Sequence, residues 1–220
     1  MIEDIRGHLA GHPSLRKSDL DRALGAMAAT PRERFVPPGY GNLAYLPMAG
    51  AIGHGQSISN PFLVAAMTAA VRPHATARVL DVGTGSGYQA AVLSRLAREV
   101  ISVEIVPLLA EEARVRLEAL GCPNVRVVSG DATALDTVTG RFDAVIVAAG
   151  CCVVPPTLAD RVAPTGRLVM PLGPTAGSER LAVLERTPQG MLATDMGSVS
   201  FVPLTGLHGR TSSPTPTDPS

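Results

Sequence analysis

A strand that ends in a glycine-rich loop and continues directly into a helix is the feature that most restricts the fold of this chain. Residues 79–87 read Val-Leu-Asp-Val-Gly-Thr-Gly-Ser-Gly, and a second predicted strand, 100–105, carries Glu104 near its end. Glycines let a backbone approach a ligand where a Cβ would clash. A carboxylate at the end of the next strand can accept hydrogen bonds from both ribose hydroxyls. The pattern predicts a nucleoside pocket more strongly than the alternative, in which the glycines serve only close packing of strand and helix.

The spacing of the loop glycines narrows the class of cofactor. A dinucleotide fingerprint needs its third glycine at position 88, where this chain has Tyr88. A nicotinamide cofactor with its pyrophosphate is therefore less favoured than a nucleoside without phosphates, of which S-adenosylmethionine is the commonest. The candidate cofactor contacts in the loop are Gly83, Thr84, Gly85, Ser86 and Gly87.

Residues at the ends of other predicted strands belong to the same hypothesis, because ligands of open α/β sheets lie at the carboxyl ends of the strands. Asp81 is expected either to orient the loop or to reach the methionine amine indirectly. Asp131 could accept a hydrogen bond from the adenine amine, although a turn aspartate is an equally common role for such a residue. The neighbours Ile105 and Ala132 complete the set of candidate contacts.

The composition of the 220-residue chain limits its partners and surroundings. An apolar fraction of 45% supports a real core, and 19 basic residues balance 19 acidic ones, so nothing indicates nucleic acid or an anionic membrane as a partner. The first residues carry acids and no apolar run, which predicts no secretory signal. No stretch approaches the roughly 20 apolar residues of a membrane helix. Three cysteines, two of them adjacent, make a poor disulfide framework or zinc site and favour a reducing cytoplasm.

Strands and helices alternate from residue 78 onward, as in βαβ units on a parallel sheet. The last two strands are expected to form an antiparallel edge. The predicted strands are 78–82, 100–105, 124–129, 142–148, 166–171, 180–185 and 199–203. Helices are predicted at 18–29, 61–70, 88–97, 108–120 and after Pro155-Pro156. We expect a segment of helices and loops over 1–75, which the family resemblance described below implies to be an N-terminal helical cap and substrate segment, a cofactor domain over 76–208, and a disordered Ser/Thr/Pro-rich tail over 209–220.

The stretch 31–61 is rich in proline and glycine, and an irregular segment of that length is usually functional or disordered. Its end, 52–61, reads Ile-Gly-His-Gly-Gln-Ser-Ile-Ser-Asn-Pro. The hydroxyls of Ser57 and Ser59, just before a predicted helix, suit a carboxylate ligand. The residues alone favour the plainer interpretation that Ser59 or Asn60 caps the helix. His54, between two glycines, is interpreted as a loop residue and not as a base.

Longer motifs run through most of the chain. They include Arg34-Phe-Val-Pro37, Gly55-Gln-Ser-Ile-Ser59, Leu80-Asp-Val-Gly-Thr-Gly-Ser-Gly-Tyr-Gln89 and Phe201-Val-Pro-Leu-Thr205. On these motifs, over roughly nine-tenths of its length, the chain resembles the protein-L-isoaspartate O-methyltransferases. The resemblance implies a class I S-adenosylmethionine-dependent methyltransferase fold, Rossmann-like, with a mostly parallel seven-stranded sheet and an N-terminal helical cap. It also implies, as the substrate, the α-carboxylate of an isoaspartyl residue in damaged peptides and proteins.

Roles for individual residues follow from the same resemblance. Ser59 matches the active-site serine of the family, Glu104 its ribose-binding acid, and Asp131 the aspartate that meets adenine. Thr205 matches the threonine that closes the pocket. The residues expected to lie over the cofactor are Gln56, Ser57, Ile58 and Ser59.

The implied chemistry fits these residues. A carboxylate, whose ordinary pKa is about 4, is already a nucleophile at neutral pH and needs no general base. Methyl transfer from a sulfonium is an in-line displacement, which leaves S-adenosylhomocysteine, so the enzyme mainly aligns and desolvates the partners. Ser59 is expected to hold one carboxylate oxygen as a hydrogen-bond donor. No metal is required.

The chain departs from the family pattern at a few positions. The family has aspartate after the Ala44-Tyr45 pair, where this chain continues Leu46-Pro47-Met48, and it tends to have glycine where Ala132 stands. These departures leave open a tailoring enzyme that esterifies an ordinary aspartate of one peptide or partner protein, on the way to succinimide and isoaspartate. A cofactor-binding protein without turnover is a second alternative, and a nicotinamide dehydrogenase is a third.

Overall fold

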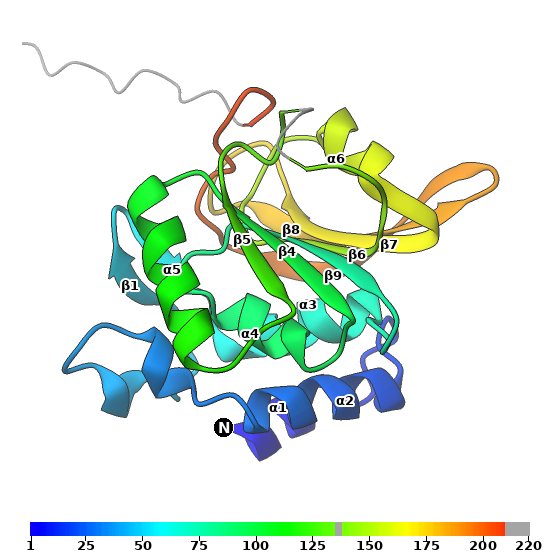
Figure 1. Ribbon diagram of the computed structural model, residues 1–220. Coiled ribbons are helices and arrows are strands. Elements are labelled where there is room, and N and C mark those ends of the chain that lie inside the picture. Colours follow the sequence, from blue (N-terminus) through cyan, green and yellow to red (C-terminus); the bar gives the residue numbers. More distant parts are fainter. Residues whose placement is uncertain (135–137, 210–220) are drawn as a thin grey trace, which may run out of the picture.

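Seven strands form one sheet at the centre of the molecule (Figure 1). The computed structural model describes residues 1–134 and 138–209. The strands are β3 (Arg78–Val82), β4 (Glu99–Glu104), β5 (Val125–Ser129), β6 (Phe142–Val147), β7 (Val162–Leu172), β8 (Glu179–Thr187) and β9 (Gly190–Val199). Their order across the sheet is β5-β4-β3-β6-β7-β8-β9.

Five of these strands, from β5 to β7, pair in parallel, whereas β8 and β9 pair antiparallel at one edge. The central strands β3, β4 and β6 are runs of buried aliphatic residues, as expected of parallel strands covered on both faces. The predicted mostly parallel sheet of a class I methyltransferase is confirmed. The carboxyl ends of β3, β4 and β6 meet at one edge, where the glycine loop begins.

Helices cover both faces of the sheet (Figure 1). The larger group is α1 (Ile2–Leu9), α2 (Lys17–Ala28), α3 (Pro61–Val71), α4 (Tyr88–Ser94) and α5 (Pro107–Ala119), and the other face carries α6 (Pro156–Arg161). Strand residues alternate between these faces: Val79 belongs to the hydrophobic cluster of the first group, and Leu80 to that of the second. Within the described ranges, no helix is long and apolar enough to cross a membrane.

The predicted N-terminal cap is continuous with the rest of the core. Leu24 and Met27 of α2 lie in the same hydrophobic cluster as Val79 and Ile146 of the sheet. The division between 1–75 and 76–208 therefore stays a prediction. Most of the predicted tail, residues 210–220, lies outside the described part of the chain.

Several elements differ from the sequence-based expectation. The last strand is β9 (Gly190–Val199) and not 199–203, because β9 forms a hairpin with β8. The segment 201–205 instead makes an isolated bridge, Pro203 to Gly150, since proline cannot donate to a ladder. Helix α1 and a small hairpin, β1 (Gly50–Gly53) with β2 (Gln56–Ile58), were not predicted.

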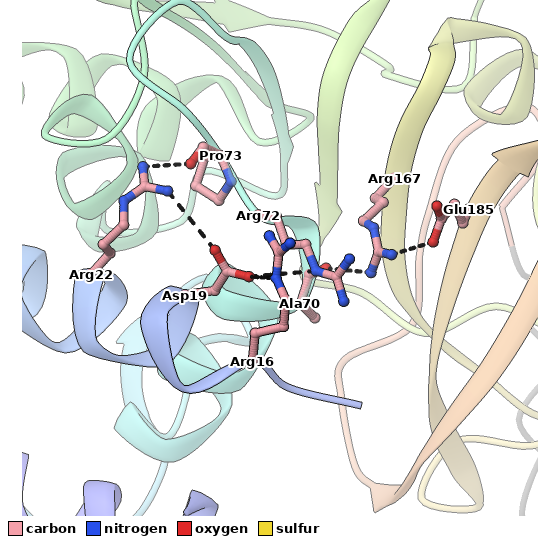
Figure 2. A network of polar contacts seen from close by, with 8 residues as sticks. All are labelled: Arg16, Asp19, Arg22, Ala70, Arg72, Pro73, Arg167 and Glu185. Carbon is pink, nitrogen blue, oxygen red and sulfur yellow. Dashed lines mark hydrogen bonds and ion pairs between the residues drawn. The ribbon is translucent and has the colours of Figure 1, made fainter. Parts of the chain in front are cut away.

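The carboxylate of Asp19 on α2 lies close to three arginines from α2 and from the ends of α2 and α3 (Figure 2). Asp19 is 6% exposed, and its carboxylate lies 2.5 Å from Nε of Arg16, 3.5 Å from Nε of Arg72 and 3.9 Å from Nη1 of Arg22. Arg22 also donates to the carbonyl oxygen of Pro73 at 2.6 Å. Nearby, Arg167 of β7 donates to the carbonyl oxygen of Ala70 in α3 and pairs with Glu185 of β8. These contacts stabilise the packing of α2 against the end of α3 and the packing of α3 against the sheet.

Replacing Asp19 by alanine is expected to lower the free energy of unfolding by about 1–3 kcal/mol, because it leaves converging arginines without their counter-ion. The matched control is Asp21→Ala, which removes a more exposed partner of Arg6 and Lys17 and should lower the free energy of unfolding by clearly less than Asp19→Ala does. Denaturant melts of both variants measure the difference. Equal losses would mean that Asp19 has no special structural role.

Candidate active site

A cavity opens at the carboxyl ends of β3, β4 and β6, beneath the segment that precedes α3. It encloses about 910 Å³ of space, part of it open to solvent. Asp81, Gly87 and Asp131 stand outside its lining. The predicted site residues that line the cavity are Gln56, Ser57, Ile58, Ser59, Gly83, Thr84, Gly85, Ser86, Glu104, Ile105, Ala132 and Thr205.

Glu104 closes the end of β4 with both carboxylate oxygens engaged. Oε2 accepts a hydrogen bond from the backbone N–H of Gly85 at 2.8 Å, and Oε1 accepts one from the backbone N–H of Val106 at 3.0 Å. The residue is 5% exposed and lines the cavity. A carboxylate has about four acceptor positions, so two hydroxyl groups of a ligand can still bind it. The acid thus fixes the glycine loop and faces the ligand space at once.

Asp81 acts behind the loop and not in the cavity. Its Oδ2 accepts a hydrogen bond from Ser102 at 2.7 Å, and the Ser102 hydroxyl lies 2.6 Å from that of Thr84, which does line the cavity. This chain of hydroxyls favours the loop-orienting alternative for Asp81. The side chain is fully buried, and its Oδ1 has no hydrogen-bond partner among the residues that the structure describes. Burial raises the pKa of Asp81 to about 7, against the hydrogen bond from Ser102 and with the nearby charge of Glu104.

The raised pKa of Asp81 predicts a pH dependence of stability. The folded protein holds the proton of Asp81 more tightly than the unfolded chain does. The contribution of protonated Asp81 to the free energy of unfolding is therefore complete below pH about 4 and is lost as the pH rises to about 7. Asp81→Asn, which keeps an acceptor for Ser102 but cannot ionise, should remove this slope, worth up to about 4 kcal/mol. Denaturant melts from pH 4 to 8 test it. Parallel curves for the two proteins would contradict the assignment.

Gly87 serves packing more than ligand contact. It has φ +89°, and a Cβ at this position would meet the Leu117 side chain of α5 at 3.3 Å. The third loop glycine therefore allows α4 to start close to α5. The sequence pattern could not separate this role from that of Gly83 and Gly85.

Asp131 holds the C-terminal segment against the cavity. Its Oδ1 accepts hydrogen bonds from the backbone and the hydroxyl of Thr133, and Oδ2 accepts one from the backbone N–H of Leu207 at 2.7 Å. Burial opposes ionisation, but these hydrogen bonds lower the pKa of Asp131. Thr205, which precedes this anchored turn, lines the cavity. The contact of Asp131 with adenine stays a prediction.

Ser59 directly follows the β1–β2 hairpin and lines the cavity. His54 and Gly55, with φ of +53° and +70°, form the tight turn of the hairpin, which agrees with the interpretation of His54 as a loop residue. Asn60, and not Ser59, caps α3: its side chain accepts a hydrogen bond from the backbone N–H of Phe62 at 2.9 Å. The capping role that competed for Ser59 therefore belongs to its neighbour.

A second groove meets the first cavity at this point. It encloses about 1000 Å³ of space, part of it open to solvent, and the residues that line this groove alone are Ala49, Asn60, Leu63, Ser200 and Phe201. Four residues line both spaces: Ser57, Ser59, Ala148 and Val202. Two ligands placed in the two spaces would therefore meet beside the hydroxyls of Ser57 and Ser59.

Several lining residues were not among the candidates. Met67 of α3 and Tyr88 and Gln89 of α4 are buried against the cavity. Only a weak signal pointed to α3: its sequence contains no charged residue, which indicates a helix covered on most sides. Tyr88 and Gln89 belong to the loop motif, but the pattern treats them as helix residues.

Comparison with known proteins agrees with this geometry. The sequence profile of the protein-L-isoaspartate(D-aspartate) O-methyltransferase family matches residues 14–209. The chain belongs to this family. Relatives named protein-L-isoaspartate O-methyltransferase include one from Gloeobacter violaceus, 47% identical over 86% of this chain and 93% of its own length. Another, from Methanoregula boonei, is 41% identical over 86% of each chain.

Solved structures show the same fold. A Plasmodium falciparum protein in complex with S-adenosyl-L-homocysteine has a TM-score of 0.75 and 20% identity, over 92% of this chain and 97% of its own. A second structure, named as a protein-L-isoaspartate O-methyltransferase, has a TM-score of 0.76 and 24% identity, over 94% of this chain and 67% of its own. Both likenesses extend over more than nine-tenths of this chain, so they support the same overall fold.

Proposed function

We propose that the protein transfers a methyl group from S-adenosyl-L-methionine to the α-carboxylate of L-isoaspartyl residues in peptides and proteins. The backbone nitrogen that follows attacks the resulting ester and releases methanol as a succinimide forms, and hydrolysis of the succinimide leads to repair. Membership in the family and relatives of that name at up to 47% identity support the activity. The single structural observation that carries it is the meeting of two cavities at Ser59.

The first cavity suits the cofactor. Glu104 stands where ribose hydroxyls would be bound, and Gly83 and Gly85 bring the backbone close to the ligand space. The apolar side chains of Val64 and Met67 also line this cavity. The bound cofactor supplies an electrophilic methyl group on a sulfonium. A structural neighbour binds S-adenosyl-L-homocysteine, the product of such a transfer.

The second groove suits the acceptor peptide. Its walls combine neutral polar groups of Ser57, Ser59 and Asn60 with the apolar Leu63 and Phe201. An extended peptide can pack on the apolar side chains while its isoaspartyl carboxylate reaches Ser59. The Ser59 hydroxyl then donates a hydrogen bond to one carboxylate oxygen and turns the other toward the methyl group. Closure by residues around Thr205 reduces the access of water to the reacting groups.

The experiment is methyl transfer from labelled S-adenosyl-L-methionine to a pair of peptides that differ only in isoaspartate or aspartate at one position. We expect base-labile label on the isoaspartyl peptide and none on its twin. Label on the aspartyl peptide alone would contradict the repair function and would show that the enzyme esterifies an ordinary aspartate. Bound cofactor without label on either peptide would show that the protein binds the cofactor but does not transfer its methyl group.

The proposal includes peptide and protein partners in the cytoplasm. Cys122, Cys151 and Cys152 are free thiols, which is typical of reducing compartments. Cell fractionation would test this location, and recovery of the protein in a secreted or membrane fraction would contradict it.

A further inference from the structure

Arg32 is a fully buried arginine beside the candidate site. It begins the short helix η1 (Arg32–Phe35) and is only 1% exposed. Its Nε donates to the carbonyl oxygen of Ala44 at 2.7 Å, and its Nη2 donates to that of Ser59, also at 2.7 Å. One guanidinium thus fixes the peptide of the residue at which the two cavities meet.

The charge of Arg32 has no counter-ion in the part of the chain that the structure describes. Arg32 is the one buried arginine or lysine there, and no aspartate or glutamate forms an ion pair with it. The arginines of the network in Figure 2 differ, since Asp19 or Glu185 lies within reach of them. A guanidinium remains protonated when buried, and an unbalanced buried cation is costly.

Tyr88 accompanies this charge. Nη1 of Arg32 and the hydroxyl of Tyr88, which is 2% exposed, make no hydrogen bond of full geometry within the described ranges, but the two groups lie close enough to affect each other's pKa. The guanidinium carbon lies 4.7 Å from the centroid of the Tyr88 ring, and Tyr88 lines the first cavity. Arg32 itself lies outside the lining of both spaces, behind Ser59 and Tyr88. Ser59 and Tyr88 therefore separate the charge of Arg32 from any ligand in the two spaces.

We propose that Arg32 is a positioning residue that fixes Ser59 and supplies the buried positive charge that selects an anionic acceptor, the isoaspartyl carboxylate, over neutral groups. This rests on the proposed function and deepens it. The neutral hydroxyls of Ser57 and Ser59 cannot by themselves distinguish a carboxylate from a carboxamide. A fixed charge behind Ser59 can, because Coulomb attraction acts on the carboxylate alone.

The size of the expected effect follows from Coulomb's law. A charge roughly 7 Å from a carboxylate, at an effective dielectric constant of about 20, changes carboxylate binding by about 50-fold, and stronger screening reduces the effect toward about 10-fold. A purely structural role of Arg32 would weaken carboxylate and carboxamide ligands equally. The ratio of the two affinities is therefore the informative quantity.

The test measures the binding of two peptides to the protein saturated with S-adenosyl-L-homocysteine, which prevents turnover. One peptide carries isoaspartate, and the other carries the same residue with its α-carboxylate as a carboxamide. For Arg32→Gln we expect the preference for the carboxylate to fall by about 10-fold or more. Arg32→Lys keeps the charge and should keep the preference within about 3-fold, even where Ser59 is held less well.

Arg22→Gln is the matched control, since Arg22 also donates to a backbone carbonyl but lies away from both cavities; its preference should equal that of the wild type. An unchanged preference in Arg32→Gln would overturn the inference. So would a loss of S-adenosyl-L-homocysteine affinity above about 10-fold in Arg32→Gln, because the charge would then serve the cofactor. A wild-type protein without any preference would instead count against the proposed acceptor.

Discussion

Replacing Glu104 by glutamine is expected to weaken the binding of S-adenosyl-L-homocysteine by about 100-fold. Both carboxylate oxygens accept backbone N–H groups, from Gly85 and Val106. A glutamine can offer only one acceptor oxygen, so its amide N–H₂ would face one of these N–H donors. The variant therefore disturbs the glycine loop and also removes the charge that would hold two ribose hydroxyls.

Isothermal titration with S-adenosyl-L-homocysteine measures this loss. Glu111→Gln is the control, because Glu111 is an exposed residue of α5 that pairs only with Arg114 in the described structure. Its affinity should match the wild type. If Glu104→Gln bound the ligand within about 3-fold of the wild type, Glu104 would be a structural residue and not a ligand contact.

Replacing Ser59 by alanine is expected to lower kcat by about 10- to 100-fold while the affinity for S-adenosyl-L-homocysteine stays within about 3-fold. The hydroxyl borders both cavities, and its proposed role is to orient the acceptor. The backbone of Ser59, which Arg32 holds through the carbonyl oxygen, is unchanged in the variant. Steady-state kinetics and ligand titration separate the two effects.

Asn60→Ala is the companion variant for Ser59, because Asn60 caps α3. Loss of the cap should lower the free energy of unfolding by about 1 kcal/mol, whereas Ser59→Ala should leave it nearly unchanged. Undiminished turnover in Ser59→Ala, or a stability loss equal to that of Asn60→Ala, would make Ser59 a structural residue.

The parallel part of the sheet could be predicted from sequence because its strands are buried on both faces. β3 was placed at its observed bounds, and β4 and β6 were placed within one residue. β9 was missed because most of its residues are exposed or half-buried and no run of buried aliphatic residues marks it. The β1–β2 hairpin was missed because its glycines also fit an irregular segment. Tertiary pairing, and not local pattern, forms both.

The site was predictable where residues follow strands in the chain. Glu104 and the loop of Gly83 and Gly85 stand at the cavity because parallel strands end at a common edge. Arg32 gave no such signal: its part in the site depends on a contact with Ser59, 27 positions away in the chain. The contact of Asp131 with adenine stays a prediction, and the hydrogen bonds that it accepts from Thr133 and Leu207 depend on the fold of the C-terminal segment, which the sequence pattern did not reveal.

A crystal structure with both S-adenosyl-L-homocysteine and an isoaspartyl peptide would test the account most directly. The account predicts the nucleoside against Glu104 in the first cavity and the peptide in the groove of Leu63 and Phe201. One carboxylate oxygen should lie about 3 Å from the Ser59 hydroxyl, and the other should face the cofactor sulfur with room for a methyl group between them. A peptide bound elsewhere, or a carboxylate turned away from both Ser59 and the sulfur, would contradict it.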